Sequence, residues 1–188
     1  MPRTAMLALL LVAFPAFAGT RLKTPDEEAL KAFRLTSDNV RKAAAVTRRL
    51  AAEVSKDPSL TDSADRKGRK AETLDEKAKA LESDPRIASA LRAESIGARE
   101  YVMVQIVALQ ARLIAAMKAQ GVPIDAADLA EAMNPANVEF VETHRKEMEE
   151  LDRSQQELEK LSKPANRGSQ REPADGVQQD GPVQPEQK

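Results

Sequence analysis

The apolar positions of this chain predict a set of helices around one strongly hydrophobic segment. In the range Tyr101–Met117, only Gln105, Gln110 and Arg112 interrupt an otherwise apolar run. A helix that is hydrophobic on most of its circumference belongs in the middle of a domain. We therefore expect a central helix over about Ala98–Gln120.

The two sides of this central helix are predicted to differ in burial. The least apolar line should face solvent and contains Gln105, Ala108, Arg112, Ala115 and Ala119. The line expected to lie deepest contains Val102, Ile106, Leu109, Leu113 and Met117. Truncation of Leu109 to alanine should then cost about 2–5 kcal/mol of stability. Gly121, followed by Val122 and Pro123, predicts the end of the helix.

A long first helix is predicted to begin after Thr24, because a Thr N-cap is followed by proline and, at the third helical position, by Glu27. It should end at Asp57, which precedes a proline. Its apolar seam has the three-four spacing of a heptad and contains Leu30, Phe33, Ser37, Val40, Ala44, Thr47, Ala51 and Val54. Several of these residues are small, so the seam could pack within a bundle or form a homodimer.

Further helices are predicted on both sides of the central one. A second helix should cover about 62–83, and one or two helical turns should lie within 125–133. Asp84 and Asn134 each precede a proline, which predicts the start of a short third helix and of a long last helix. The buried face of the last helix should contain Val138, Val141, Met148, Leu151, Leu158 and Leu161. The outer face of the last helix is acidic and the first helix is richer in Lys and Arg, so the two are expected to be neighbours. As the longest helices, they should overhang the bundle at one end.

Composition supports an all-α fold. The 188 residues are dominated by Ala, Leu, Glu, Lys and Arg, with four Phe, one Tyr and no Trp. We predict one domain over residues 19–162, an antiparallel helical bundle of about four main helices with one or two short helices. Residues 163–188 are rich in Pro and Gln and lack apolar surface, which predicts a disordered tail.

The N-terminal segment predicts export. In the range Met1–Ala18, Arg3 supplies a positive charge and Ala5–Phe14 is an apolar stretch of signal-peptide length. Ala16-Phe17-Ala18 fits the small-x-small cleavage pattern. Together with the lack of cysteine, this predicts a periplasmic or extracellular protein.

His144, the only histidine, is the one candidate for a cofactor ligand. It lies beside the apolar stripe of the last helix and could be a boundary residue that contacts Glu147. The alternative is an axial haem ligand opposite Met103, Met117 or Met133, as in small periplasmic b-type cytochromes.

Other motifs are incomplete. A di-iron bundle would place glutamate three residues before His144, where Val141 stands. Ser37-Asp38-Asn39 matches one triplet of the serine β-lactamases, but the companion Ser-x-x-Lys and Lys-Thr-Gly motifs are missing. The basic cluster Arg66–Lys70 is flanked by acidic residues and is interpreted as a solvated helix face. No catalytic residue or metal ligand is therefore predicted, and the chain is expected not to be an enzyme.

Three stretches of the chain resemble other sequences. DPRIASAL, REYVMVQIVALQ and NPANVEFVETHR are similar to stretches of uncharacterised secreted bacterial helical proteins, and this resemblance implies no activity. The chain is also superficially similar to small periplasmic helical chaperones of the stress-response type. It lacks their repeated Leu-Thr-x-x-Gln motif.

These features predict a protein that binds a protein or envelope partner without a cofactor. The formal net charge of −1 argues against nucleic acid as a partner. Arg112 and two Gln residues inside the apolar run favour a core helix, so we expect no membrane span in the mature chain. The alternative function is a b-type haem-binding electron carrier that uses His144.

The exported protein should begin at Gly19, because signal peptidase cleaves after a small-x-small sequence such as the one at 16–18. Intact-mass spectrometry of the secreted protein tests this. A mass that includes Met1–Ala18 would contradict the predicted signal peptide.

Overall fold

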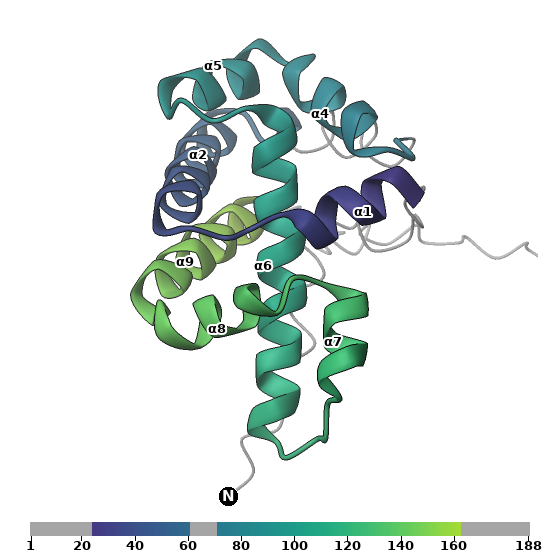
Figure 1. The fold of residues 1–188 in the computed structure, drawn as a ribbon. Coiled ribbons are helices and arrows are strands. Elements are labelled where there is room, and N and C mark those ends of the chain that lie inside the picture. Colours follow the sequence, from purple (N-terminus) through teal and green to yellow (C-terminus); the bar gives the residue numbers. More distant parts are fainter. Residues whose placement is uncertain (1–23, 61–70, 163–188) are drawn as a thin grey trace, which may run out of the picture.

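The computed structural model describes residues 24–60 and 71–162 as a set of helices (Figure 1). These are α1 (Thr24–Ala32), α2 (Ser37–Lys56), α4 (Leu74–Glu82), α5 (Pro85–Ala93), α6 (Ala98–Ala119), α7 (Ala126–Ala132), α8 (Pro135–Thr143) and α9 (Arg145–Ser162). No strand occurs in these two ranges, which confirms the all-α class. The predicted signal peptide, the basic cluster Arg66–Lys70 and the predicted tail lie outside them.

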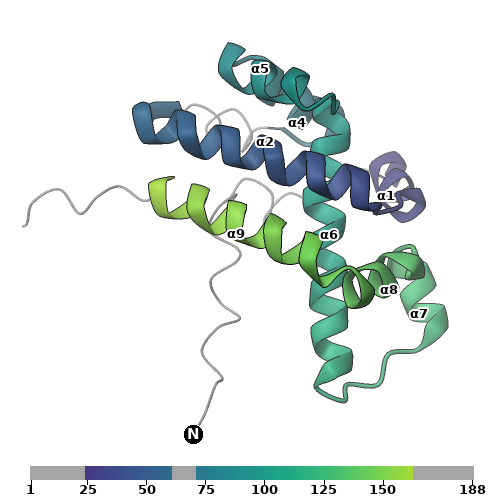
Figure 2. The same cartoon turned by 90° about the vertical axis from the view of Figure 1, so that its left-hand side faces the viewer.

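Helix α6 passes through the middle of the fold, as predicted. Helices α2 and α9 lie side by side across it, while α4 and α5 pack at its N-terminal end and α8 lower down (Figures 1 and 2). The neighbouring positions predicted for the first and last helices are therefore confirmed. The predicted antiparallel arrangement is not confirmed, because α2 and α9 run in the same direction and α6 crosses both at a steep angle (Figure 2).

The predicted first helix is two helices, α1 and α2, separated at residues 33–36. Thr36 and Asn39 form a capping box that begins α2, with the Thr36 hydroxyl accepting the Asn39 N–H at 3.2 Å. The fully buried Asn137 of α8 holds the break in place. Its side-chain oxygen accepts the Leu35 N–H at 2.8 Å, and its amide donates to the Phe33 carbonyl at 2.9 Å. These bonds satisfy backbone groups that a continuous helix would have paired internally.

The predicted second helix begins later than expected among the residues that the structure describes. Thr73 and Glu76 form a second capping box, so α4 starts at Leu74, and the predicted portion over 62–70 lies outside the described ranges. The short third helix is confirmed as α5. The Asp84 carboxylate accepts the Arg86 N–H at 2.9 Å, and proline follows Asp84 at the first helical position.

The predicted last helix is also two helices, α8 and α9. His144 leaves the helical conformation between them, although its backbone N–H still donates to the Phe140 carbonyl at 2.8 Å. The breaks leave α2 and α9 with 20 and 18 residues, against 22 in α6. The expected overhang of the first and last helices is therefore wrong, and it is the C-terminal half of α6 that extends beyond α2 and α9 (Figure 2).

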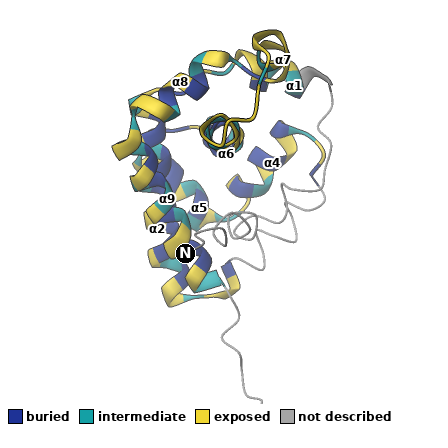
Figure 3. Ribbon diagram, turned by 90° about the horizontal axis from the view of Figure 1, so that it is seen from below, coloured by how far each residue is buried: buried dark blue, intermediate teal, exposed yellow. Residues whose placement is uncertain are grey.

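The prediction of which face of α6 lies deepest is wrong for the C-terminal half of the helix. Leu109, Leu113 and Met117 are 36%, 50% and 37% exposed, whereas the fully buried residues include Val104, Val107, Ala108 and Ala111. Figure 3 shows this exposed end of the helix in the view along its axis. Because α6 is apolar on nearly every side, its own periodicity does not select the inner face. The small and polar side chains turn inward, where neighbouring helices approach closely and offer hydrogen-bond partners.

Because Leu109 is partly exposed, its truncation to alanine should cost much less stability than the sequence predicted. Val104→Ala should lower the free energy of unfolding by about 1.5–3 kcal/mol, because it empties a fully buried position. Leu109→Ala removes more atoms but should cost about 1 kcal/mol or less, since much of that side chain meets water. Urea unfolding of both variants measures the difference. A larger cost for Leu109→Ala would contradict the observed orientation of α6.

Candidate functional site

His144 is a boundary residue whose side chain is held by α8, the helix that ends just before it. Its imidazole stacks on the Phe140 ring with centroids 4.1 Å apart and an interplanar angle of 9°. Atom Nδ1 lies 2.9 Å from the Thr143 hydroxyl and 3.2 Å from the Phe140 carbonyl. The half-buried position agrees with the boundary interpretation. The polar edge of His144 was predicted to contact Glu147, whereas Nδ1 bonds to Thr143 and Phe140.

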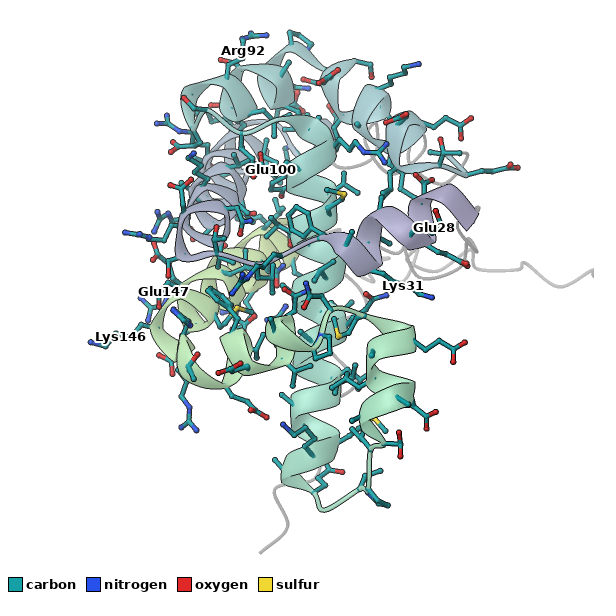
Figure 4. The ribbon with its side chains drawn as sticks, in the orientation of Figure 1. Glu28, Lys31, Arg92, Glu100, Lys146 and Glu147 are labelled. Atoms are coloured by element: carbon teal, nitrogen blue, oxygen red, sulfur yellow. The ribbon has the colours of Figure 1, made fainter. Side chains whose placement is uncertain are left out.

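Glu147 bonds instead to α2. Its carboxylate accepts the Ser37 hydroxyl at 3.1 Å, and Figure 4 places Glu147 near the start of α9 beside α2. A hydrogen bond from its own backbone N–H is the main cause that lowers the pKa of Glu147. Ser37 and the nearby charges of His144 and Arg41 lower this pKa further. Glu147 thus joins α9 to α2.

The methionines considered as haem ligands lie in unlike surroundings. Met133 is buried, Met103 is half-buried and Met117 is exposed on the far half of α6. One face of the His144 ring is covered by Phe140, and Nδ1 is already engaged. This arrangement gives the haem alternative no specific support. Within 24–60 and 71–162, no three His, Cys, Asp or Glu side chains are grouped as a metal site would require.

A row of buried polar side chains connects α2 and α6. The Thr47 hydroxyl donates to the Ala43 carbonyl at 2.9 Å and lies 3.0 Å from the Tyr101 hydroxyl, which is therefore the donor between the two. The Gln105 amide also donates to Thr47, at 3.4 Å. Burial raises the pKa of Tyr101 to about 12, so its hydroxyl stays protonated at neutral pH and does not serve as a base.

The row continues from α6 into α9 through Arg112. The Gln155 amide bonds to the side-chain oxygen of Gln105, and the Arg112 guanidinium donates to Gln155 at 3.3 Å. Arg112 also forms an ion pair with Asp152 and donates to the Ala108 carbonyl at 3.3 Å. Burial lowers the pKa of Arg112 to about 10, while the Asp152 carboxylate favours its charged form. Arg112 therefore remains positive at neutral pH.

This polar row holds helices together and offers no free reactive group. Its members satisfy one another's hydrogen bonds and connect α2, α6 and α9, as buried polar groups must. The sequence placed Gln105 and Arg112 on the solvent side, and this prediction is wrong. A sequence signal existed, because Ala108 and Ala111 share that side and small residues allow close helix packing.

The strongest candidate for a binding site is an exposed apolar strip on the overhanging half of α6. We define the apolar stripe as Leu109, Leu113, Met117 and Val122, which are between 36% and 50% exposed. The first three are four residues apart and share one helix face. The Val122 N–H donates to the Met117 carbonyl at 3.0 Å, and Gly121 has a φ of +79°, so the chain reverses and Val122 lies next to Met117.

The apolar stripe is the large hydrophobic surface that the described part of the chain leaves exposed. Sequence reasoning missed it as a site, since it assigned three of its four residues to the core. Contiguous exposed apolar side chains on a folded protein mark interaction sites, whereas scattered ones carry no such meaning. The stripe can bind an apolar ligand or partner, but it contains no group able to perform chemistry.

Comparison with known proteins found no match for this chain. The chain matches no protein-family model, no curated protein and no solved structure. The resemblance to secreted bacterial helical proteins therefore stays a prediction. Among the described helices, α6 alone is long and apolar enough to span a membrane, a criterion that core helices also meet.

In the ion pair between Arg112 and Asp152, removal of one partner should cost more stability than removal of both. Asp152→Asn should lower the free energy of unfolding by roughly 2–4 kcal/mol, because it leaves the largely buried Arg112 charge without its counterion. The double variant Arg112→Met and Asp152→Leu should recover most of this loss, since no buried charge remains. Urea unfolding at pH 7 compares the variants. Equal costs for the single and double variants would contradict this interpretation of the pair.

Proposed function

We propose that this protein is exported and binds another polypeptide through the apolar stripe, without catalysing a reaction. The observation that carries the proposal is the exposure of Leu109, Leu113, Met117 and Val122 as one contiguous strip. An exposed strip of this kind lowers solubility and contributes nothing to the core. Such strips mark surfaces that a binding partner covers. Export is supported by the charged, apolar and small-residue pattern of Met1–Ala18.

The surroundings of α6 favour a polypeptide partner over a bilayer. In its N-terminal half the helix packs against α2, α4 and α5, and its polar side chains have partners on α2 and α9. Insertion of α6 into lipid would break these hydrogen bonds and carry the Arg112 charge into hydrocarbon, at a cost of roughly 2.5–3.5 kcal/mol or more for the charge. The helix therefore belongs to the folded domain, with one face available at its free end.

A non-catalytic role is supported by the polar residues with the most unusual surroundings. Tyr101 and Arg112 have shifted pKa values, and such groups are often catalytic. Both are, however, bonded to neighbouring side chains of the buried row, where they join helices. His144 is likewise bonded within α8.

Leu113→Glu should abolish capture of the partner, because it places a charge at the most exposed position of the stripe. The protein beginning at Gly19 serves as bait in envelope extract, and captured proteins are identified by mass spectrometry. A partner held by the unchanged protein should be lost from Leu113→Glu, with no change in thermal unfolding.

Ala52→Glu on the exposed face of α2 provides the matched control, since it adds the same charge away from the stripe. Capture should persist with this variant. A partner that is retained by Leu113→Glu, or lost equally from both variants, would show that the stripe is not the binding surface.

A further inference from the structure

The dimensions of the apolar stripe limit what can bind it. From Leu109 to Met117 it extends over about two helical turns, or roughly 12 Å at ~1.5 Å per residue, and it is one side chain wide. Four partly exposed side chains offer each copy a few hundred Å², below the roughly 800 Å² per partner of a stable interface. A narrow strip of this kind fits the edge of a single helix and does not support a stable dimer on its own.

The chain itself offers no segment of matching chemistry after removal of its signal peptide. Outside the described ranges, the mature sequence contains only three large apolar residues, namely Leu22, Val177 and Val183. They are too few and too widely spaced to form an apolar helix face. The occupant of the stripe must therefore come from another molecule.

The charge next to the stripe is negative. From Val122 to Thr143 the sequence contains five acidic residues and no Lys or Arg. Helix α7, which carries two of them and has a third, Asp125, as its N-cap, stands beside the free half of α6 in both side views (Figures 1 and 2). Asp128 and Glu131 on α7 are exposed and form no ion pair with any residue that the structure describes.

The two cations on the C-terminal half of α6 are both paired. Arg112 is paired with Asp152, and Lys118 lies 2.8 Å from the Glu142 carboxylate. Between Leu109 and Ala132, the charged side chains outside these two ion pairs are the carboxylates of Asp125, Asp128 and Glu131. A second copy bound stripe to stripe would bring two such acidic ends together, which is unfavourable.

We propose that the apolar stripe binds a cationic amphipathic helix of a partner protein, an inference that rests on the proposed function. The apolar face of that helix would cover Leu109, Leu113 and Met117, and its Lys or Arg side chains would lie within the field of the α7 carboxylates. Opposite charges across an interface speed association and select the partner. Screening weakens this attraction at high salt, because the carboxylates lie near the stripe and not inside it.

Two labelled synthetic helices test the charge of the partner. Both have about 18 residues and the same Leu-rich face, and they differ in whether Lys or Glu occupies the polar face. Fluorescence anisotropy with the protein beginning at Gly19 should give a Kd on the order of tenfold lower for the Lys peptide. The difference should shrink when NaCl is raised from about 50 mM to about 500 mM.

Two sets of variants separate the apolar and charged contributions. Leu113→Glu should abolish binding of both peptides. The pair Asp128→Asn and Glu131→Gln should weaken only the Lys peptide, by several-fold, and leave thermal unfolding unchanged. The matched control, Glu28→Gln with Glu149→Gln, removes the same charge from exposed positions on α1 and α9 and should not alter binding.

The outcomes distinguish this inference from the proposed function. Equal binding of both peptides, each lost in Leu113→Glu, would overturn the cationic partner and leave the docking surface intact. Failure of both peptides to bind the unchanged protein, or binding of both that is unaltered in Leu113→Glu, would overturn both the inference and the proposed function. Sedimentation that reveals a dimer lost in Leu113→Glu would assign the stripe to a second copy and overturn the inference. A loss of Lys-peptide binding equal in the control pair would show that α7 is not the source of the attraction.

Discussion

The structure depends on the contact between the small, polar side of α6 and the two helices that cross it. Ala108 and Ala111 are fully buried there and let the neighbouring helices approach closely. Gln105 and Arg112 then reach partners on α2 and α9. Because a buried polar group without a partner costs about 1–3 kcal/mol, these bonds select one rotation of an otherwise apolar helix. That rotation directs the large side chains of the C-terminal half towards water.

A second constraint comes from the two breaks that shorten the long helices. Asn137 satisfies the backbone at the break between α1 and α2, and thereby joins α8 to this break across 102 and 104 residues of sequence. His144 ends α8 and redirects the chain into α9, whose Glu147 bonds to Ser37. With α2 and α9 shortened, neither of them covers the last turns of α6, which α8 reaches on one side through the ion pair between Glu142 and Lys118. The breaks thus create the overhang on which the apolar stripe lies.

The candidate site is therefore a consequence of the scaffold. The hydrogen-bonded row fixes the rotation of α6, and the formed helix presents Leu109, Leu113 and Met117 at fixed spacing, which lowers the backbone ordering cost on binding. In the interaction that we propose, the acidic α7 beside it supplies a preference for one sign of charge. Affinity and selectivity then have separate physical sources, which single substitutions can address one at a time.

The sequence by itself determined the all-α class, the bounds of α6, the proline-marked starts of α5 and α8, and the neighbouring positions of α2 and α9. These features follow from local capping, composition and charge. Only the tertiary structure decided the breaks at 33–36 and at His144, since Asn137 acts across a distance that no local pattern contains. It also decided which face of α6 is exposed. Val104 and Leu109 are both apolar residues, and whether each is buried depends on where α2, α8 and α9 lie.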